Sequence, residues 1–300
     1  MFDNPPQSSP FNLENDGAYQ RWRQEKLADY PATLADLLVE IDNPSALSEA
    51  ERSALINQCA KTNMVLYRVK PPQTIGDNPL PSLLEQLGVR AVDYNLGAGT
   101  DGLSKLSPGG SAHNPFANYI PYRQAAIGWH TDGYYNTADR QVRTLALYCE
   151  RAAHQGGENR LFDHEMAYIR LRDQNPEFIR ILMDPEVMTI PARLENGLVA
   201  RPDRTGPVFS LDPNSGHLHM RYTARTISIR WKSSPLLQQT LATLSHIMEE
   251  PQLGIFQGCL PAGFGLISHN VLHTREAFSD LEGGEKRTLY RLRCFDRIAV

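Results

Sequence analysis

Short segments in which apolar and polar side chains alternate constrain the fold of this chain more than any other feature. The clearest are Thr144–Cys149, Val208–Leu211, Leu218–Tyr222 and Leu289–Phe295. A period of two places successive side chains on opposite faces of a β-strand, so each segment predicts a strand. Many such strands with few helices between them indicate a mainly β fold, a β-sandwich or jelly roll with helical decoration.

Helix signals and composition divide the chain further. Ser48–Glu51 is a capping box that opens a helix, and a capping serine followed by proline predicts a helical insertion near residues 234–250. Residues 1–15, rich in Pro, Asn and Ser, predict a flexible N-terminal arm. Residues 16–300 are predicted to form a single domain, in which a helical and strand extension precedes the β core.

The overall composition narrows the class of protein. The 300 residues are 41% hydrophobic and 21% charged, with a net charge of −4, which is typical of a globular chain with a substantial core. A pI near 6.1 argues against nucleic acid or an anionic membrane as the main partner. The four cysteines form no Cys-x-x-Cys pair, and neither a leader peptide nor an apolar run of ~20 residues is visible. We therefore expect a cytoplasmic protein with reduced thiols.

The segment Trp129–Asp132 carries the first residues with metal chemistry. On an extended chain His130 and Asp132 point to the same side, so an imidazole and a carboxylate can occupy adjacent positions on one metal ion. Two histidines and one carboxylate on one face of an octahedron leave positions open, which suits non-haem Fe(II) oxygen chemistry. A His-x-Asp pair alone is weak evidence, because it occurs by chance in many chains. The third ligand must come from elsewhere, and both His269 and His273 are available.

The second half of the pattern lies more than 130 residues later, in Gly265–Phe278 and Arg287–Arg291. Trp-His-Thr-Asp, then His-Thr-Arg-x-x-Phe, then Arg-x-x-x-Arg resembles the TauD/TfdA-like family of Fe(II)/2-oxoglutarate-dependent dioxygenases. Related branches are the γ-butyrobetaine hydroxylases, the clavaminate synthase-like enzymes and the carbon-starvation-induced glutarate hydroxylases. The similarity covers roughly residues 55–297.

The resemblance implies a fold, a cofactor and a reaction. The fold is a double-stranded β-helix, a jelly roll, in agreement with the strand pattern. The ligands of Fe(II) are His130, Asp132 and His273, because in the family the metal histidine precedes a pair such as Gly-Arg, and His269 is then a structural neighbour. The enzyme uses 2-oxoglutarate and O2 and releases succinate and CO2. The presence of Asp132 favours hydroxylation or desaturation over halogenation.

The resemblance also assigns residues to the co-substrate. Arg287 takes the distal carboxylate of 2-oxoglutarate, which the planar guanidinium can bind with two parallel hydrogen bonds. Arg291 lies four residues further along the same predicted strand and faces the same way, where it either assists Arg287 or faces the substrate. Asn159 occupies the position of the threonine in the family's Gly-Gly-x-Thr turn, and its amide can donate the same hydrogen bond.

The substrate side is predicted from tyrosines and arginines near the metal motif and on later strands. These candidates are Tyr122, Arg123, Tyr134, Tyr135, Arg221 and Arg293. They favour a small molecule that is carboxylate-bearing or amino-acid-like, with no nucleic acid or membrane as partner. The sequence leaves a homo-oligomer open.

Two other classes of protein stay open at this point. A jelly roll with two histidines and one aspartate can bind Zn or Mn and act as an isomerase or hydrolase, although those reactions need no clamp such as Arg287. A non-catalytic binding protein on the same fold is the second alternative. It would be favoured by the loss of a metal ligand, and none is lost.

Overall fold

The computed structural model describes residues 6–70, 78–108, 119–195, 198–225, 229–250 and 253–299. By their contacts these residues divide into two compact units. The single domain expected from residue 16 onwards stays a prediction. The first unit comprises the chain up to Tyr30, Gly133–Gln141 and Phe162–Ile255. The second unit comprises Pro31–Asp132, Val142–Leu161 and the chain from Phe256.

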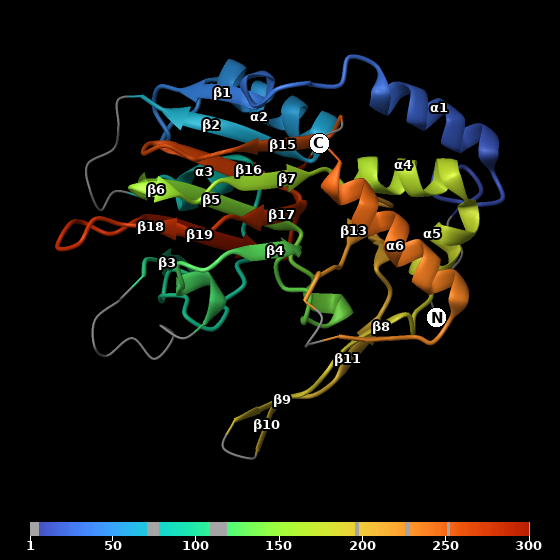
Figure 1. The fold of residues 1–300 in the computed structure, drawn as a ribbon. Coiled ribbons are helices and arrows are strands. Elements are labelled where there is room, and N and C mark those ends of the chain that lie inside the picture. Colours follow the sequence, from blue (N-terminus) through green and yellow to red (C-terminus); the bar gives the residue numbers. More distant parts are fainter. Residues whose placement is uncertain are drawn as a thin grey trace. The chain divides into compact units, whose positions relative to one another are not determined.

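Two β-sheets form the frame of the second unit (Figure 1). The larger has the strand order β1-β2-β16-β5-β19-β3, and only the β1–β2 pair is parallel. The smaller has the order β15-β7-β17-β4, and β6 and β18 form a separate pair. The strands of the larger sheet are β1 (Leu38–Ile41), β2 (Met64–Val69), β16 (Phe264–Ser268), β5 (Thr144–Arg151), β19 (Thr288–Cys294) and β3 (Ser104–Leu106). The other strands are β15 (Ile255–Gly258), β7 (Asn159–Phe162), β17 (Leu272–Arg275), β4 (Ile127–His130), β6 (Gln155–Gly156) and β18 (Phe278–Ser279).

Alternation along the large sheet separates a core from a pocket. Side chains such as Tyr67 and Ile267 pack into a buried cluster with the residues of two helices. Their strand neighbours Leu66 and Leu266 line a pocket together with His273 of the smaller sheet. Successive strand residues point to opposite faces, so one strand contributes to both the core and the pocket.

The predicted mainly β jelly roll with helical decoration is confirmed. The helices of this unit are η1 (Leu34–Leu37), α2 (Glu49–Thr62), α3 (Leu80–Gln86) and η2 (Ile120–Tyr122).

Helices and short β-ribbons make up the first unit. Its β-ribbons pair as β11-β8-β14, β10-β9 and β12-β13. Its helices are α1 (Asp16–Leu27), η3 (Ala138–Arg140), α4 (His164–Gln174), α5 (Pro176–Leu182) and α6 (Pro235–Glu249). Its strands are β8 (Met188–Ile190), β9 (Arg193–Glu195), β10 (Leu198–Arg201), β11 (Arg204–Gly206), β12 (Phe209–Leu211), β13 (Leu218–Met220) and β14 (Arg230–Trp231).

Both predicted helix starts are present. The Ser48 hydroxyl accepts a hydrogen bond from the backbone N–H of Glu51, and the carboxylate of Glu51 accepts one from the backbone N–H of Ser48. Ser234 caps α6 by accepting from the N–H of Leu237, with proline at the first helical position. Local rules located these starts because a helix terminus has orphan N–H groups that a nearby side chain must satisfy.

The N-terminal arm differs from its prediction where the structure describes it. Phe11 is buried and packs edge-on against Trp22 and Tyr168, with ring centroids 5.0 and 5.4 Å away. Arg172 donates to the backbone carbonyls of Pro10 and Asn12. Tyr168 and Arg172 lie far along the chain, so the composition of residues 1–15 did not reveal these contacts. Residues 1–5 of the predicted arm lie outside the described residues.

Cys59, Cys149, Cys259 and Cys294 are all free, and only Cys259 is exposed. Within the described ranges, no helix has both the length and the apolar character that a membrane crossing needs.

A buried ion cluster joins α1 to the start of α4 within the first unit. The Nζ of Lys26 lies 2.8 Å from Asp163 Oδ2 and 2.6 Å from Glu165 Oε2. Asp163 also caps α4 by accepting from the N–H of Glu165, and it accepts a hydrogen bond from the Tyr30 hydroxyl. A nearby pair, Arg23–Asp173, has the same charges but is about a third exposed.

We predict that Lys26→Met destabilises the protein by about 3–5 kcal/mol, because two buried carboxylates lose their counter-ion. Arg23→Ala on the same helix should cost about 0–1 kcal/mol, because its pair with Asp173 is solvated. Urea unfolding followed by circular dichroism measures both losses. Equal losses would contradict the assignment of Lys26 as a buried charge anchor.

Candidate metal centre

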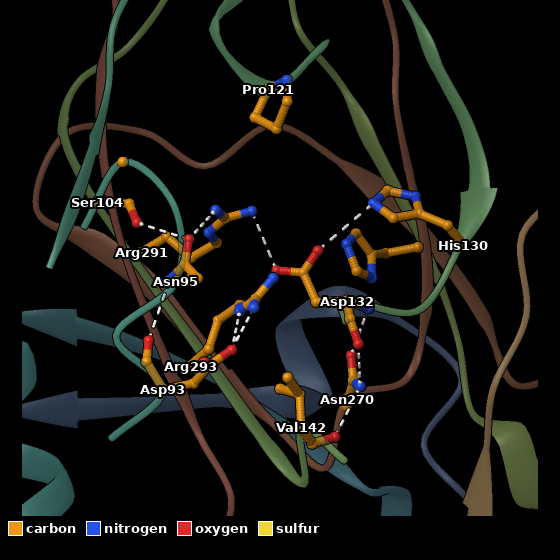
Figure 2. Close-up of polar contacts among 12 residues, drawn as sticks. Asp93, Asn95, Ser104, Pro121, His130, Asp132, Val142, Asn270, Arg291 and Arg293 are labelled. Atoms are coloured by element: carbon orange, nitrogen blue, oxygen red, sulfur yellow. Dashed lines mark hydrogen bonds and ion pairs between the residues drawn. The ribbon is translucent and has the colours of Figure 1, made fainter. Parts of the chain in front are cut away.

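Three predicted ligands converge in the second unit. His130 ends β4, Asp132 follows two residues later, and His273 lies on β17 directly opposite His130 in the strand register. The candidate ligand atoms of the three residues all lie within 4.8 Å of one another. The two imidazole centroids are 4.2 Å apart, and His130 Nε2 is 3.7 Å from Asp132 Oδ1, as Figure 2 shows for the latter pair. The strand pairing therefore brings together residues that are 143 positions apart, from His130 to His273.

Each histidine presents the same free nitrogen. The Nδ1 atom of His130 lies 2.9 Å from the carbonyl oxygen of Gly128, and that of His273 lies 2.9 Å from the carbonyl oxygen of Val271. A carbonyl only accepts, so Nδ1 carries the proton and Nε2 keeps its lone pair. Burial lowers the pKa of His130 to about 3, with a further contribution from His273, and burial also lowers the pKa of His273. Both rings are thus neutral near pH 7 and ready to coordinate.

Asp132 is ionised and its two oxygens are used differently. Burial acts to raise the pKa of its carboxyl, but Arg291 and then Arg293 outweigh burial and hold the pKa well below its usual range. Oδ2 accepts a hydrogen bond from Arg291 Nη1 at 3.1 Å (Figure 2). Oδ1 faces His130. Two neutral imidazoles and one carboxylate oxygen form a donor set that fits Fe(II), because this set leaves other coordination positions open.

Arg291 and Arg293 are fixed by residues of the segment that precedes β3. The second guanidinium arm of Arg291 donates to Asn95 Oδ1 at 3.3 Å, and the hydroxyl of Ser104 lies 3.5 Å from the same oxygen. Arg293 is only 2% exposed, and its Nε donates to Asp93 Oδ2 at 3.0 Å. The guanidinium of Arg293 is therefore paired with Asp93. The sequence had predicted a substrate contact for Arg293 and did not indicate this pair.

Arg287 is a buried cation whose guanidinium has no acidic partner among the described residues. It is 5% exposed, and its guanidinium lies over the ring of Phe278 at 4.8 Å. Its backbone N–H donates to Asp280, but no residue in the described ranges accepts a hydrogen bond from its guanidinium. Burial lowers the pKa of Arg287, while Cys149, Asp280 and Cys259 act to raise it. A buried cation with unused donors favours a site for an external anion.

The Gly156–Gly157 turn leads into β7, whose Asn159 lines a pocket together with His273. Both glycines have positive φ, 74° and 80°, and a Cβ on Gly156 would lie 2.3 Å from the carbonyl oxygen of Ala277. The turn thus requires glycine, and it brings Gly157 next to Arg287. Asn159 follows the turn and donates to the Gly157 carbonyl at 3.3 Å. The pocket is lined by Leu34, Leu66, Leu147, Asn159, Leu161, Gly258, Cys259, Leu260, Leu266 and His273.

His269 lies apart from the three converging ligands. It is 2% exposed, and its Nδ1 hydrogen-bonds to Oδ1 of Asn63 at 3.1 Å. Its backbone N–H donates to the Asn63 carbonyl, and Arg297 also contacts the Asn63 side chain. The ring is thus used to hold the residue that ends α2.

The residues predicted for the substrate side fall in both units. In the second unit, Tyr122 is buried with its hydroxyl 3.3 Å from the carbonyl oxygen of Gly97, and Arg123 is exposed. In the first unit, Tyr134 and Tyr135 form an edge-on pair at 5.3 Å. Arg221 of the same unit is buried and donates to the carbonyls of Tyr134, Met188 and Arg204. Its guanidinium supports the local backbone.

Sequence reasoning missed Asp93, Asn95 and Asn270. Asp93 and Asn95 orient the arginines of β19 from about 200 residues away, and Asn270 contacts Asp132 across 138 positions. No spacing rule connects such residues, because the pairing of distant strands decides which of them meet. The only sequence signal is that Asn270 lies within the histidine motif.

Comparison with known proteins places this geometry in context. The model of the taurine catabolism dioxygenase TauD, TfdA family matches residues 39–293. A uridine-5'-phosphate dioxygenase of Amycolatopsis sp is 32% identical over 161 residues, 51% of this chain and 55% of the relative. One of Streptomyces sp is 31% identical over 183 residues, 57% of this chain and 61% of the relative. The match thus spans less than two thirds of either relative.

A taurine dioxygenase structure from Burkholderia xenovorans superposes with a TM-score of 0.56. The alignment covers 88% of this chain and 89% of that one, at 15% sequence identity. At this identity the likeness concerns the fold alone.

We predict that His273→Ala abolishes Fe(II) binding, because the variant removes one of the three donor atoms. His269→Ala should keep Fe(II) bound and only lower the stability, because the His269 ring serves Asn63. Anaerobic Fe(II) titration and the metal content of the purified variants measure the difference. Loss of iron in His269→Ala with iron retained in His273→Ala would reverse the choice of ligand.

Proposed function

The chain belongs to the taurine catabolism dioxygenase TauD, TfdA family, and we propose that it is an Fe(II)- and 2-oxoglutarate-dependent dioxygenase that oxidises a small molecule. One observation carries the proposal: His130, Asp132 and His273 form a compact set of two neutral imidazoles and one ionised carboxylate. Other coordination positions stay available to a co-substrate and to O2.

The three side chains would hold the metal in complementary ways. Each histidine offers Nε2, because a backbone carbonyl occupies Nδ1. Asp132 offers Oδ1, because Arg291 occupies Oδ2, so the ion pair favours coordination through one oxygen. When bound, Fe(II) supplies the activation of O2 that is coupled to decarboxylation of 2-oxoglutarate to succinate and CO2. The protein orients the reactants and excludes water.

Arg287 and Asn159 form the proposed co-substrate site. 2-Oxoglutarate has one end for the metal and a distal carboxylate that needs a cation in a partly buried place. Arg287 is buried and its guanidinium has unused donors, so a carboxylate there would gain charge-assisted hydrogen bonds in a low dielectric. Asn159 lines the pocket with His273 and offers an amide. The leucines of this pocket would contact the methylene groups of the co-substrate.

Neither alternative class accounts for the ligand set and Arg287 together. A Zn or Mn isomerase or hydrolase needs no buried arginine with free donors beside the metal pocket, and a binding protein has no need for an intact ligand set. Arg287 therefore favours the 2-oxoglutarate enzyme.

The proposed substrate is a small anionic molecule. The two relatives above are named for uridine 5'-phosphate, which supports nucleoside phosphates as first candidates, beside the carboxylates and amino acids favoured by the sequence. Tyr122, Arg123, Tyr134 and Tyr135 stay proposed contacts. Arg221 and Arg293 are weaker candidates, because backbone carbonyls and Asp93 already engage their guanidinium groups.

We predict that a screen of uridine 5'-phosphate, other nucleoside phosphates, small carboxylates and amino acids finds substrate-dependent release of succinate. Fe(II) should support this release and Zn(II) should inhibit it, because Zn(II) has no redox chemistry. Succinate is measured by chromatography with mass detection. No succinate with any metal or candidate would count against the proposed function.

We further predict that Arg287→Ala raises the KM for 2-oxoglutarate roughly 10- to 150-fold, which corresponds to the loss of charge-assisted hydrogen bonds worth about 1.5–3 kcal/mol. Arg287→Lys should give a smaller rise, because lysine keeps the charge but not the fork. Steady-state kinetics at saturating Fe(II) measure both variants.

Arg275 offers a matched control for Arg287. It is buried and packs over the same Phe278 ring at 4.9 Å, but its guanidinium donates to the carbonyls of Pro121, Arg123 and Ala125. Arg275→Ala should therefore lower stability with little change in the KM for 2-oxoglutarate. An unchanged KM in Arg287→Ala would move the clamp to another arginine, with Arg291 next.

A further inference from the structure

One side-chain amide forms hydrogen bonds with both the backbone N–H and the backbone carbonyl of Asp132. Oδ1 of Asn270 accepts from the N–H of Asp132 at 2.8 Å, and Nδ2 of Asn270 donates to the carbonyl of Asp132 at 2.9 Å (Figure 2). The same Nδ2 donates to the carbonyl of Val142 at 2.8 Å. Asn270 is 1% exposed and lies with a φ of 55° in the turn between β16 and β17.

These contacts lie where the chain passes between the two units. Asp132 is the last residue of the second unit before the chain leaves it for Gly133–Gln141, and Val142 is the first residue after its return. The amide of Asn270 therefore binds the residues on both sides of the segment Gly133–Gln141. Tyr134 and Tyr135 lie within Gly133–Gln141. Asn270 therefore binds the backbone of Asp132 directly before this segment begins.

Asp132 needs such a support more than the two histidines do. His130 and His273 lie on β4 and β17, which pair with each other through their backbones. Asp132 lies beyond the end of β4, and in the described residues its backbone hydrogen bonds go to Asn270. Its direction thus depends on two side chains, Asn270 for the peptide and Arg291 for the carboxylate.

We propose that Asn270 is a positioning residue that sets the direction of Asp132 toward the metal; this inference rests on the proposed function. Groups that orient a ligand without touching the metal commonly change metal affinity 10- to 100-fold when removed. The competing explanation is that Asn270 only stabilises the turn. That explanation predicts a loss of stability with no specific effect on metal binding.

The chain contains a matched control in Asn63. It too is 1% exposed with a positive φ, 58°, and its side chain accepts hydrogen bonds from His269 and Arg297. Glycine tolerates positive φ, so Asn270→Gly and Asn63→Gly each remove an amide without adding backbone strain. Asn270→Asp is a second variant that keeps the shape and the positive φ but cannot donate to the two carbonyls.

The experiment measures urea unfolding of the metal-free variants and the dissociation constants of Fe(II) and Co(II) by anaerobic titration. We expect both glycine variants to lose stability. Asn270→Gly should weaken metal binding 10- to 100-fold and alter the ligand-field absorption of the Co(II) form, and Asn63→Gly should do neither. Asn270→Asp should weaken metal binding in the same direction, and it decides the matter if Asn270→Gly does not fold.

Two results would overturn the inference: unchanged metal affinity and Co(II) spectrum in the folded Asn270 variants, or equal weakening in Asn63→Gly. Either result leaves the proposed function standing, because the wild-type chain still binds Fe(II). A wild-type chain that binds neither metal would instead sink the proposed function, and the inference with it.

Discussion

The ion pair between Asp132 and Arg291 is the interaction on which the candidate site depends. An unpaired carboxylate in this interior would cost several kcal/mol and would take up a proton instead of staying charged. Arg291 keeps it ionised and occupies one of its oxygens, while Asn95 holds the other arm of the guanidinium. A second buried pair, Arg293–Asp93, adds positive potential beside the carboxylate without leaving Arg293 unpaired. The negative charge that a divalent metal needs is thus present before the metal arrives.

The three candidate ligands differ in how the fold holds them. The histidines are placed by antiparallel strand pairing, and in each case the backbone carbonyl two residues earlier in the chain sets the tautomer. Asp132 stands where the chain departs from the strand, so side chains must replace the missing ladder hydrogen bonds. Strand pairing thus places the two histidines, and the side chains of Asn270 and Arg291 place Asp132.

Strand alternation explains how one sheet supports both a core and a pocket. On β2 and β16, Tyr67 and Ile267 pack against the helices, and Leu66 and Leu266 face the pocket of His273. An apolar pocket wall next to the buried Arg287 gives an environment of low dielectric, in which a bound carboxylate interacts strongly with the guanidinium. In the proposed co-substrate site, this wall would pack against the methylene groups of 2-oxoglutarate while Arg287 binds the distal carboxylate.

The sequence by itself determined the features that local rules govern. Period-two segments indicated the jelly roll, capping residues located α2 and α6, and the order of His130, Asp132, His273 and Arg287 indicated the family and its chemistry. Only the tertiary structure decided which buried groups meet. It paired Arg293 with Asp93, used His269 to hold Asn63, packed Phe11 into the aromatic cluster and brought Asn270 to Asp132. These contacts join residues far apart in the chain, and their partners are selected by strand register and by the need to satisfy every buried polar group, which no local pattern encodes.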